Sequence, residues 1–306
     1  MAVVVGAGTR GALIRAMPWV FVLIWSTGFV VARFGMPYSP PLTFLSIRYA
    51  LSLACFGAWI AIAGVAWPRD KTQWAHLAIV GMLIQGGYLG GVWAAVKAGV
   101  GAGTVALVVG LQPVLTALWM SWGARDADGA QVRVSARQWF GLALGLGGLA
   151  LVVWHKLGGG EVTHWNLALA IFALFSITTG TLYQKRYVAP CDVRTASAVQ
   201  LLAALAVSLP LALLESERVV WDAQMIGAMA WSVVALTLGG NSLLYLLIQR
   251  GAATEVTSLM YLVPPCTAAL AWLLFGEALT WSMGLGMLLT ATGVALVLRA
   301  PPQIGG

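Results

Sequence analysis

Long apolar runs are the feature that most constrains the fold of this chain. The run at 102–122 carries no charged residue. As a helix rising about 1.5 Å per residue, it is long enough to cross the roughly 30 Å hydrocarbon core of a bilayer. Similar runs recur along the chain, and short connections between them hold most of the charges. We predict ten transmembrane helices, at 16–34, 41–66, 74–96, 102–122, 137–154, 165–186, 195–214, 227–248, 254–275 and 281–298.

Composition supports the same interpretation. The 306 residues are 60% hydrophobic and only 9% charged, whereas a soluble domain averages about 25% charged residues. Continuous runs, rather than short alternating segments, favour helices over a β-barrel. The sequence therefore predicts an all-α integral membrane protein whose main partner is the lipid bilayer. The formal charge of +7 is then typical of cytoplasmic loops, and no nucleic-acid partner is expected.

Metal and nucleotide sites are not predicted. The three cysteines and three histidines have no metal-ligand spacing, so we expect no metal or other cofactor. Residues 6–11 read GAGTRG, which matches the glycine pattern of a dinucleotide-binding loop. That loop needs a βαβ unit and an acidic residue about 20 positions later. Here a membrane span follows and the first acid is Asp70, so the nucleotide interpretation fails.

An internal repeat divides the chain into 1–158 and 159–306, which we call the first and second halves. At an offset of 152, Gly28 pairs with Gly180, Arg33 with Lys185, Arg48 with Gln200, Trp93 with Tyr245 and Pro113 with Pro265. In the last span of each half the offset is 145, pairing Gly141 with Gly286 and Gly148 with Gly293. One insertion in the loop at 124–133 explains the change. Because each half has five spans, an odd number, the repeats must be inverted about an axis in the membrane plane.

The basic residues predict the orientation. With the N-terminus inside, 12 of the 17 lysines and arginines lie on the inner side and four on the outer side. Cytoplasmic loops carry this excess in membrane proteins. Both termini are therefore predicted to be cytoplasmic.

Two prolines interrupt matching spans. Pro113 and Pro265 each remove a backbone N–H and displace the carbonyl four residues earlier. Such a carbonyl in hydrocarbon needs a partner from protein, water or ligand. Inverted repeats with interrupted helices indicate a secondary transporter whose site lies near the midplane, between the repeats.

Uncharged polar groups, aromatic rings and glycines lie near the predicted midplane. The candidate substrate-binding residues are Trp25, Thr27, Gly28, Gln85, Tyr88, Trp93, Gln112, Pro113, Ser176, Thr179, Tyr183, Asn241, Tyr245, Tyr261 and Pro265. The alternatives are interfacial belts or lipid contacts for the aromatic residues and helix packing for the glycines. The glycines of the last span in each half could pack these spans on the bundle or form a dimer face; packing is favoured, and we expect a monomer or weak homodimer.

Charged residues in or near the spans are few. Arg48 is the one clear charge within a span, and it either belongs to a functional site or reaches the interface or loop carbonyls. Glu255 and Glu277 flank the ninth span, where a structural role is favoured. No acid is expected near the midplane, although proton-coupled carriers usually need one. We therefore expect facilitated diffusion or exchange.

The ordered motifs resemble EamA-type carriers of the drug/metabolite transporter superfamily. They are WSTGFVVAR at 25–33, FLSIRYALS at 44–52, LQPVLTAL at 111–118, YLVPPCTAAL at 261–270 and LLFGEALTW at 273–281. The resemblance implies ten helices in an inverted five-plus-five arrangement, with spans 1–4 and 6–9 around a central cavity. It also implies alternating access and export of small metabolites. The first half departs from the pattern, with Gly123-Ala124-Arg125 where the second half has Gly276-Glu277.

Amino-acid export from the inner membrane is the predicted function. Bacterial exporters of amino acids, including aromatic ones, are similar in length and aromatic content, so aromatic and other apolar amino acids are the favoured substrates. The alternative within transport is efflux of lipophilic cations or nucleobase-like metabolites. A membrane enzyme would need a catalytic constellation, and the sequence offers none, so no enzymatic activity is expected.

Overall fold

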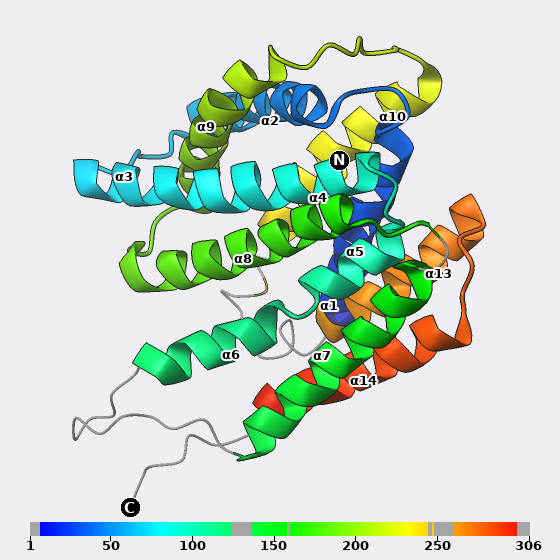
Figure 1. Cartoon of the computed structure of the whole chain (residues 1–306). Coiled ribbons are helices and arrows are strands. Elements are labelled where there is room, and N and C mark those ends of the chain that lie inside the picture. Colours follow the sequence, from blue (N-terminus) through cyan, green and yellow to red (C-terminus); the bar gives the residue numbers. More distant parts are fainter. Residues whose placement is uncertain (1–6, 124–135, 158–159, 244–246, 248–259, 299–306) are drawn as a thin grey trace, which may run out of the picture.

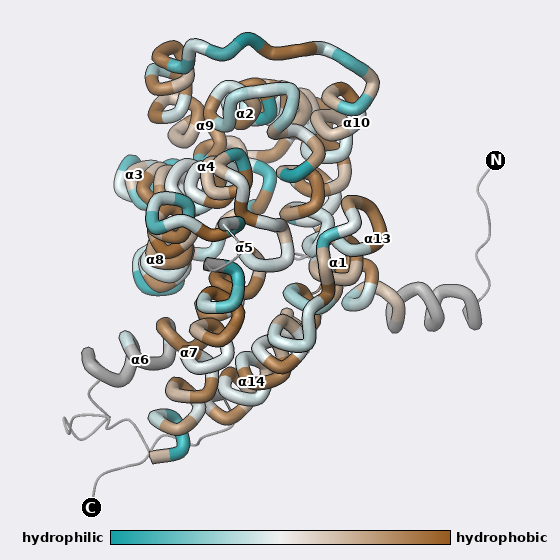
Figure 2. Tube along the Cα trace, turned by 45° about the vertical axis from the view of Figure 1, so that its right-hand side comes forward, coloured by the Kyte–Doolittle hydropathy of each residue, from teal (hydrophilic) through white to brown (hydrophobic). Residues whose placement is uncertain are grey.

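The computed structural model describes residues 7–123, 136–157, 160–243, 247 and 260–298. Within these ranges the chain is helical and contains no strand. The helices form a layered bundle (Figure 1), and hydrophobic residues recur along most of them (Figure 2). Many large apolar side chains of these helices are exposed. Exposed apolar side chains of this kind suit contact with lipid rather than water.

The described helices follow the predicted spans closely. In the first half they are α1 (Ala7–Gly35), α2 (Pro41–Ala63), α3 (Lys71–Val80), η1 (Gly81–Leu89), α4 (Gly90–Lys97), α5 (Ala102–Val109), α6 (Gln112–Gly123) and α7 (Ala136–Leu157). In the second half they are α8 (His164–Tyr187), α9 (Val193–Ala212), α10 (Ala223–Trp231), η2 (Ser232–Gly240), η3 (Met260–Leu262), α13 (Val263–Phe275) and α14 (Trp281–Leu298).

Seven of the described helices are long and apolar enough to cross a membrane. One of them runs through α3, η1 and α4 as a single span, Lys71–Lys97. Three shorter apolar helices occupy Ala102–Thr116, Val263–Phe275 and Trp281–Leu296. Each of the ten predicted spans thus overlaps a described helix, although the ninth is described only from Met260. Glu255 lies outside the described residues.

Two π-helical segments, η1 and η2, interrupt the third and eighth predicted spans. Both contain nine residues, and they begin at Gly81 and Ser232, which is within one residue of the repeat offset. In a π-helix the backbone bonds run from i to i+5, and such segments are frequent at functional sites. These π-helical segments were not predicted from the sequence.

The fourth predicted span is broken rather than kinked. α5 ends at Val109 and α6 begins at Gln112, directly before Pro113. At the break the Leu111 N–H donates to the Val108 carbonyl, three residues back. The second half repeats the arrangement, since the short 3₁₀ turn η3 precedes α13, which begins with prolines. The two breaks meet, because a Cβ on Gly110 would lie 3.1 Å from Pro264 Cγ.

Equivalent helices of the two halves pack against each other as antiparallel pairs. α2 packs on α9, α5 on α13 and α7 on α14. The last pair lies side by side in Figures 1 and 2. In it Gly148 meets Gly286 while Gly141 meets Gly293, so residue numbers rise along α7 as they fall along α14. The repeat glycines therefore serve packing between the halves.

The first helix of each half also packs against helices of the other half. α1 packs on α10, η2 and α13, and its counterpart α8 packs on α3, η1, α5 and α6. Each half thus places its first helix against the third and fourth spans of the other half. This arrangement leaves the two π-helical segments near the centre of the molecule.

Close packing of α7 and α14 predicts opposite effects for two neighbouring glycines. A Cβ on Gly148 would lie 2.5 Å from the Gly286 carbonyl oxygen, whereas a Cβ on Gly147 meets nothing within 4 Å. Gly148→Ala should lower the free energy of unfolding by about 1–3 kcal/mol through overpacking. Gly147→Ala should leave it unchanged or raise it by up to about 1 kcal/mol through helix propensity. Thermal unfolding in detergent measures both, and equal effects would contradict the close contact.

Candidate functional site

A cavity lies between the two halves at the level of the π-helical segments. Its empty volume, counted together with the open space at its mouth, is about 670 Å³. Its lining comes from α1, α2, η1, α4, α8, η2 and the residue after η2. The lining residues are Trp25, Gly28, Phe29, Arg48, Ile84, Gln85, Tyr88, Leu89, Val92, Trp93, Ile177, Leu236, Thr237 and Asn241.

The internal repeat relates more than half of this lining. Four pairs of lining residues stand at the offset of 152: Trp25 with Ile177, Ile84 with Leu236, Gln85 with Thr237, and Leu89 with Asn241. Equivalent positions of both halves therefore face one space. The cavity lies where the two repeats meet, as the interrupted spans predicted.

Aromatic side chains form part of the wall. Trp25 packs on Phe21 with ring centroids 5.2 Å apart. Tyr88 is 6% exposed, and Trp93 is 1% exposed and stacks on Phe44 at 4.3 Å. Trp93 therefore belongs mainly to the core, while Trp25 is partly exposed. Flat, rigid rings of this kind offer apolar surface to a ligand at a small entropic cost.

Arg48 is the only charged residue in the described lining of the cavity. The side chain is buried, with 7% of the residue exposed. Its Nε and Nη2 each donate to Thr237 Oγ1 at 3.1 Å. The Thr237 hydroxyl in turn donates to the Ser232 carbonyl at 2.9 Å, five residues earlier on η2. Arg48 thus lies inside the protein, and among the described residues its guanidinium donates to a side chain of the other half rather than to loop carbonyls.

The neighbouring residue on α2 reaches the other π-helical segment. The Tyr49 hydroxyl donates to the carbonyl of Gln85 on η1. A π-helical turn disturbs the regular backbone ladder, and a buried carbonyl that loses its partner is costly. Arg48 and Tyr49 together therefore connect α2 to η1 and η2, one from each half.

Six of the predicted site residues line the cavity: Trp25, Gly28, Gln85, Tyr88, Trp93 and Asn241. Tyr245 lies outside the described residues, as does the side chain of Tyr261. Pro113 and Pro265 stand at the starts of α6 and α13 and do not belong to the described lining. Their proposed role in binding stays a prediction.

The other predicted residues make contacts elsewhere. Thr27 accepts a hydrogen bond from Trp231 Nε1 at 2.9 Å, and Gln112 donates to Thr181 at 3.0 Å. The Tyr183 hydroxyl lies 2.9 Å from His76 Nδ1. The two remaining residues are on α8, where Ser176 packs against Gly87 and Thr179 is exposed.

Several lining residues were missed by sequence reasoning: Phe29, Ile84, Leu89, Val92, Ile177, Leu236 and Thr237. Three of these, Ile177, Thr237 and Leu89, are repeat partners of the predicted Trp25, Gln85 and Asn241. The repeat offset, applied to every predicted residue, was therefore the signal that could have found these three. Phe29 and Val92 carry no signal beyond ordinary apolar residues.

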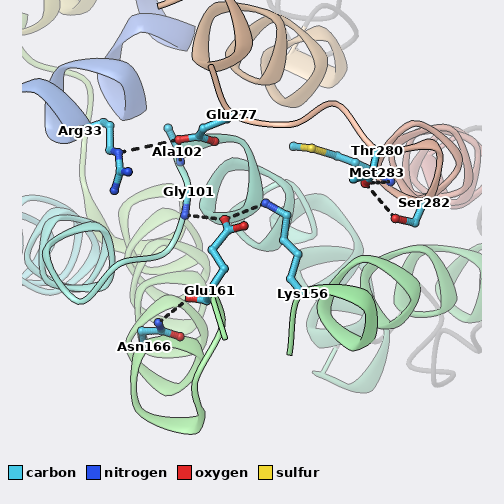
Figure 3. Close-up of polar contacts among 10 residues, drawn as sticks. All are labelled: Arg33, Gly101, Ala102, Lys156, Glu161, Asn166, Glu277, Thr280, Ser282 and Met283. Carbon is cyan, nitrogen blue, oxygen red and sulfur yellow. Dashed lines mark hydrogen bonds and ion pairs between the residues drawn. The ribbon is translucent and has the colours of Figure 1, made fainter. Parts of the chain in front are cut away.

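A second polar cluster closes one end of the bundle at the start of α5 (Figure 3). Glu277 Oε1 accepts from the Ala102 N–H at 3.1 Å and lies 4.0 Å from Arg33 Nε. Glu161 Oε1 accepts from the Gly101 N–H at 3.1 Å and from Lys156 Nζ at 2.7 Å. Carboxylates stabilise a helix N-terminus, where backbone N–H groups are unpaired and the dipole is positive.

Local geometry explains how Glu277 reaches α5. Gly276 ends α13 with φ of 66°, a left-handed conformation that glycine adopts without strain. The chain then turns so that Glu277 lies against Gly101, where a Cβ would come within 2.6 Å of Glu277 Oε2. Glu277 thus has the structural role that the sequence favoured, and it joins the two halves.

Family comparison gives the class of the protein. Residues 17–154 and 164–299 each match the EamA-like transporter family. The chain belongs to the EamA-like transporter family. The fold and the cavity between its halves are therefore those of a multi-pass membrane transporter, and the drug/metabolite transporter resemblance is confirmed.

Relatives of this EamA-family chain agree over most of its length. It is 26% identical to a "probable amino-acid metabolite efflux pump" of Salmonella typhimurium, covering 89% of this chain and 90% of that protein. It is also 26% identical to the "uncharacterized transporter YvbV" of Bacillus subtilis, covering 94% and 92%. A solved crystal structure superposes with a TM-score of 0.62 at 18% identity, covering 92% and 95%, which shows a shared fold.

The cap on α5 gives a stability prediction. Glu277 is 13% exposed, and Glu277→Ala removes an acceptor from the α5 N-terminus. We expect the free energy of unfolding to fall by about 0.5–2 kcal/mol. Glu217, which pairs with Lys97 and is 58% exposed, is the matched control, and its replacement by alanine should cost about 0–1 kcal/mol. Thermal unfolding compares them, and a larger loss for Glu217→Ala would contradict the capping role.

Proposed function

We propose that this protein exports amino acids, with aromatic and other apolar ones favoured, across the bacterial inner membrane. The observation that carries the proposal is the cavity between the halves, whose lining is related by the repeat. Sites at repeat interfaces near the midplane are typical of secondary transporters. The names of relatives such as the Salmonella efflux pump support amino acids as the substrate class.

Ten spans in two inverted five-helix repeats are the architecture we propose. The antiparallel packing of each equivalent pair, α2 on α9, α5 on α13 and α7 on α14, supports inversion. The gap between the two family matches, at 155–163, contains the boundary between the two halves. Both termini are then cytoplasmic, and the α5 cluster faces the periplasm.

Alternating access would proceed by rocking of one half against the other. At the α5 end, carboxylates of the second half bind backbone N–H groups of the first: Glu277 binds Ala102, Glu161 binds Gly101, and Glu215 binds Leu42 and Thr43. These contacts cross between the halves. They would have to break for substrate release to the periplasm, so we assign this structure to a state closed on that side.

The cavity chemistry favours a small amphiphile. Trp25 and Tyr88 would pack an apolar side chain, while the amides of Gln85 and Asn241 offer hydrogen bonds. The described lining contains no carboxylate, which favours facilitated diffusion or exchange over proton coupling. Lipophilic cations and nucleobase-like metabolites are the competing substrates.

Counterflow in liposomes that contain only the purified protein tests this function. The liposomes are preloaded with one unlabelled amino acid at a time, and the labelled form is added outside. Tracer accumulation with apolar or aromatic amino acids is the expected result. If folded protein gives no accumulation for any amino acid, the substrate class is wrong and the search moves to cations and nucleobases.

Tyr88→Ala should reduce counterflow at least about tenfold, because a stacked aromatic contact and its buried area are lost. The matched control is Trp154→Ala, since Trp154 is 81% exposed on α7, away from the cavity. Both variants are compared at equal reconstituted amounts. Unchanged transport by Tyr88→Ala would remove Tyr88 from the site.

A further inference from the structure

Arg48 is a buried charge that the proposed amino-acid site leaves unused. It lines the cavity, is 7% exposed, and forms no ion pair among the described residues. Removing a cation from water without a counter-ion is costly. An ionisable group inside a membrane protein therefore usually has a functional partner.

The hydrogen bonds of Arg48 leave donors free. A guanidinium has five N–H donors, yet its described bonds all end on one neutral oxygen, Thr237 Oγ1. Nη1 has no partner among the described residues. Arg48 itself belongs to the lining of the cavity.

The position of Arg48 breaks the symmetry of the cavity. The four repeat-related pairs in the lining are uncharged, and the repeat partner of Arg48, Gln200, does not line the cavity. The single positive charge therefore makes one side of the space electrostatically different from the other. A ligand with a negative group would be held in one orientation, with its apolar part toward the aromatic wall.

We propose that Arg48 anchors the carboxylate of the transported substrate, with Thr237 holding the guanidinium in place. This inference rests on the proposed function and narrows it to carboxylate-bearing compounds. A guanidinium matches the planar, two-oxygen geometry of a carboxylate. The same charge disfavours cations, because a lipophilic amine would bring a second positive charge into a buried site.

Thr237 is a positioning residue in this scheme. Its hydroxyl hydrogen is committed to the Ser232 carbonyl, so its oxygen faces Arg48 as an acceptor. The π-helical geometry of η2 fixes that acceptor, since the bond spans five residues. The guanidinium is thereby held by Nε and Nη2, which leaves Nη1 for a ligand.

Ligand binding to the purified protein tests the charge requirement. Three compounds share one aromatic ring: phenylalanine, 3-phenylpropionate without the ammonium, and phenethylamine without the carboxylate. Binding is measured by quenching of tryptophan fluorescence and by thermal stabilisation. We expect phenylalanine and 3-phenylpropionate to bind at least about tenfold more tightly than phenethylamine. Equal or tighter binding of phenethylamine overturns the proposal.

Variants of Arg48 distinguish a role in binding the substrate carboxylate from a purely structural role in connecting α2 to η2. Arg48→Gln keeps a donor for Thr237 but removes the charge. It should weaken the two carboxylate ligands roughly 10- to 100-fold and leave phenethylamine unchanged or improved. A purely structural role predicts an equal loss for all three compounds. Lower thermal stability with an intact carboxylate preference would likewise overturn the anchor.

Thr237 provides an independent readout that does not depend on a charge change. Thr237→Val removes the acceptor and should weaken the carboxylate ligands selectively, whereas Thr237→Ser keeps the hydroxyl and should restore their binding. If Thr237→Val binds all three compounds as the unmodified protein does, the positioning role is wrong. Substitution at Arg33, a cationic residue outside the cavity, is the matched control and should leave the ligand order unchanged.

Failure of this inference is distinguishable from failure of the proposed function. Carboxylate-selective binding that is lost in Arg48→Gln, together with no amino-acid counterflow, would retain the anchor and exclude amino-acid export. Counterflow of amino acids that Arg48→Gln leaves unchanged would retain export and overturn the anchor.

Discussion

Backbone hydrogen bonding in an apolar environment is the constraint on which this structure depends. Hydrocarbon offers no partner for a free N–H or C=O, so an uncovered interruption of a helix is costly. The interruptions here, η1, η2 and the α5–α6 break, each pack against elements of the other half. Tyr49 satisfies the carbonyl of Gln85, and Thr237 satisfies that of Ser232. In the described residues, the two π-helical segments thus lie where the two halves meet around the cavity.

Packing between equivalent helices builds that meeting place. Glycines let α7 and α14 approach so closely that their backbones are in direct contact, as at Gly148 and Gly286. The pairs α2–α9 and α5–α13 repeat the antiparallel arrangement. Where these equivalent helices meet, they leave a central cavity. More than half of its lining residues form repeat-related pairs. Among the described lining residues Arg48 alone is charged, so one asymmetric residue stands within a nearly symmetric frame.

At the α5 end, polar contacts add to the packing that holds the halves together. Glu161, Glu215 and Glu277 bind the N-terminal N–H groups of first-half elements. Such bonds are strong enough to define a state, because a carboxylate at a helix N-terminus also meets the positive end of the dipole.

The sequence by itself determined the helices, the duplication and the transporter class. Run length and the matching prolines can be interpreted with local physics, because a bilayer fixes the length of a span and proline removes a backbone N–H donor. The repeat offset is read from the sequence itself. Only the tertiary structure decided which side chains share the cavity. Gln112 and Tyr183 lie at plausible depths but contact Thr181 and His76 instead. Depth is a one-dimensional property of a span, whereas the rotation of each helix depends on its neighbours. Arg48, Thr237 and the π-helical turns were placed by that packing.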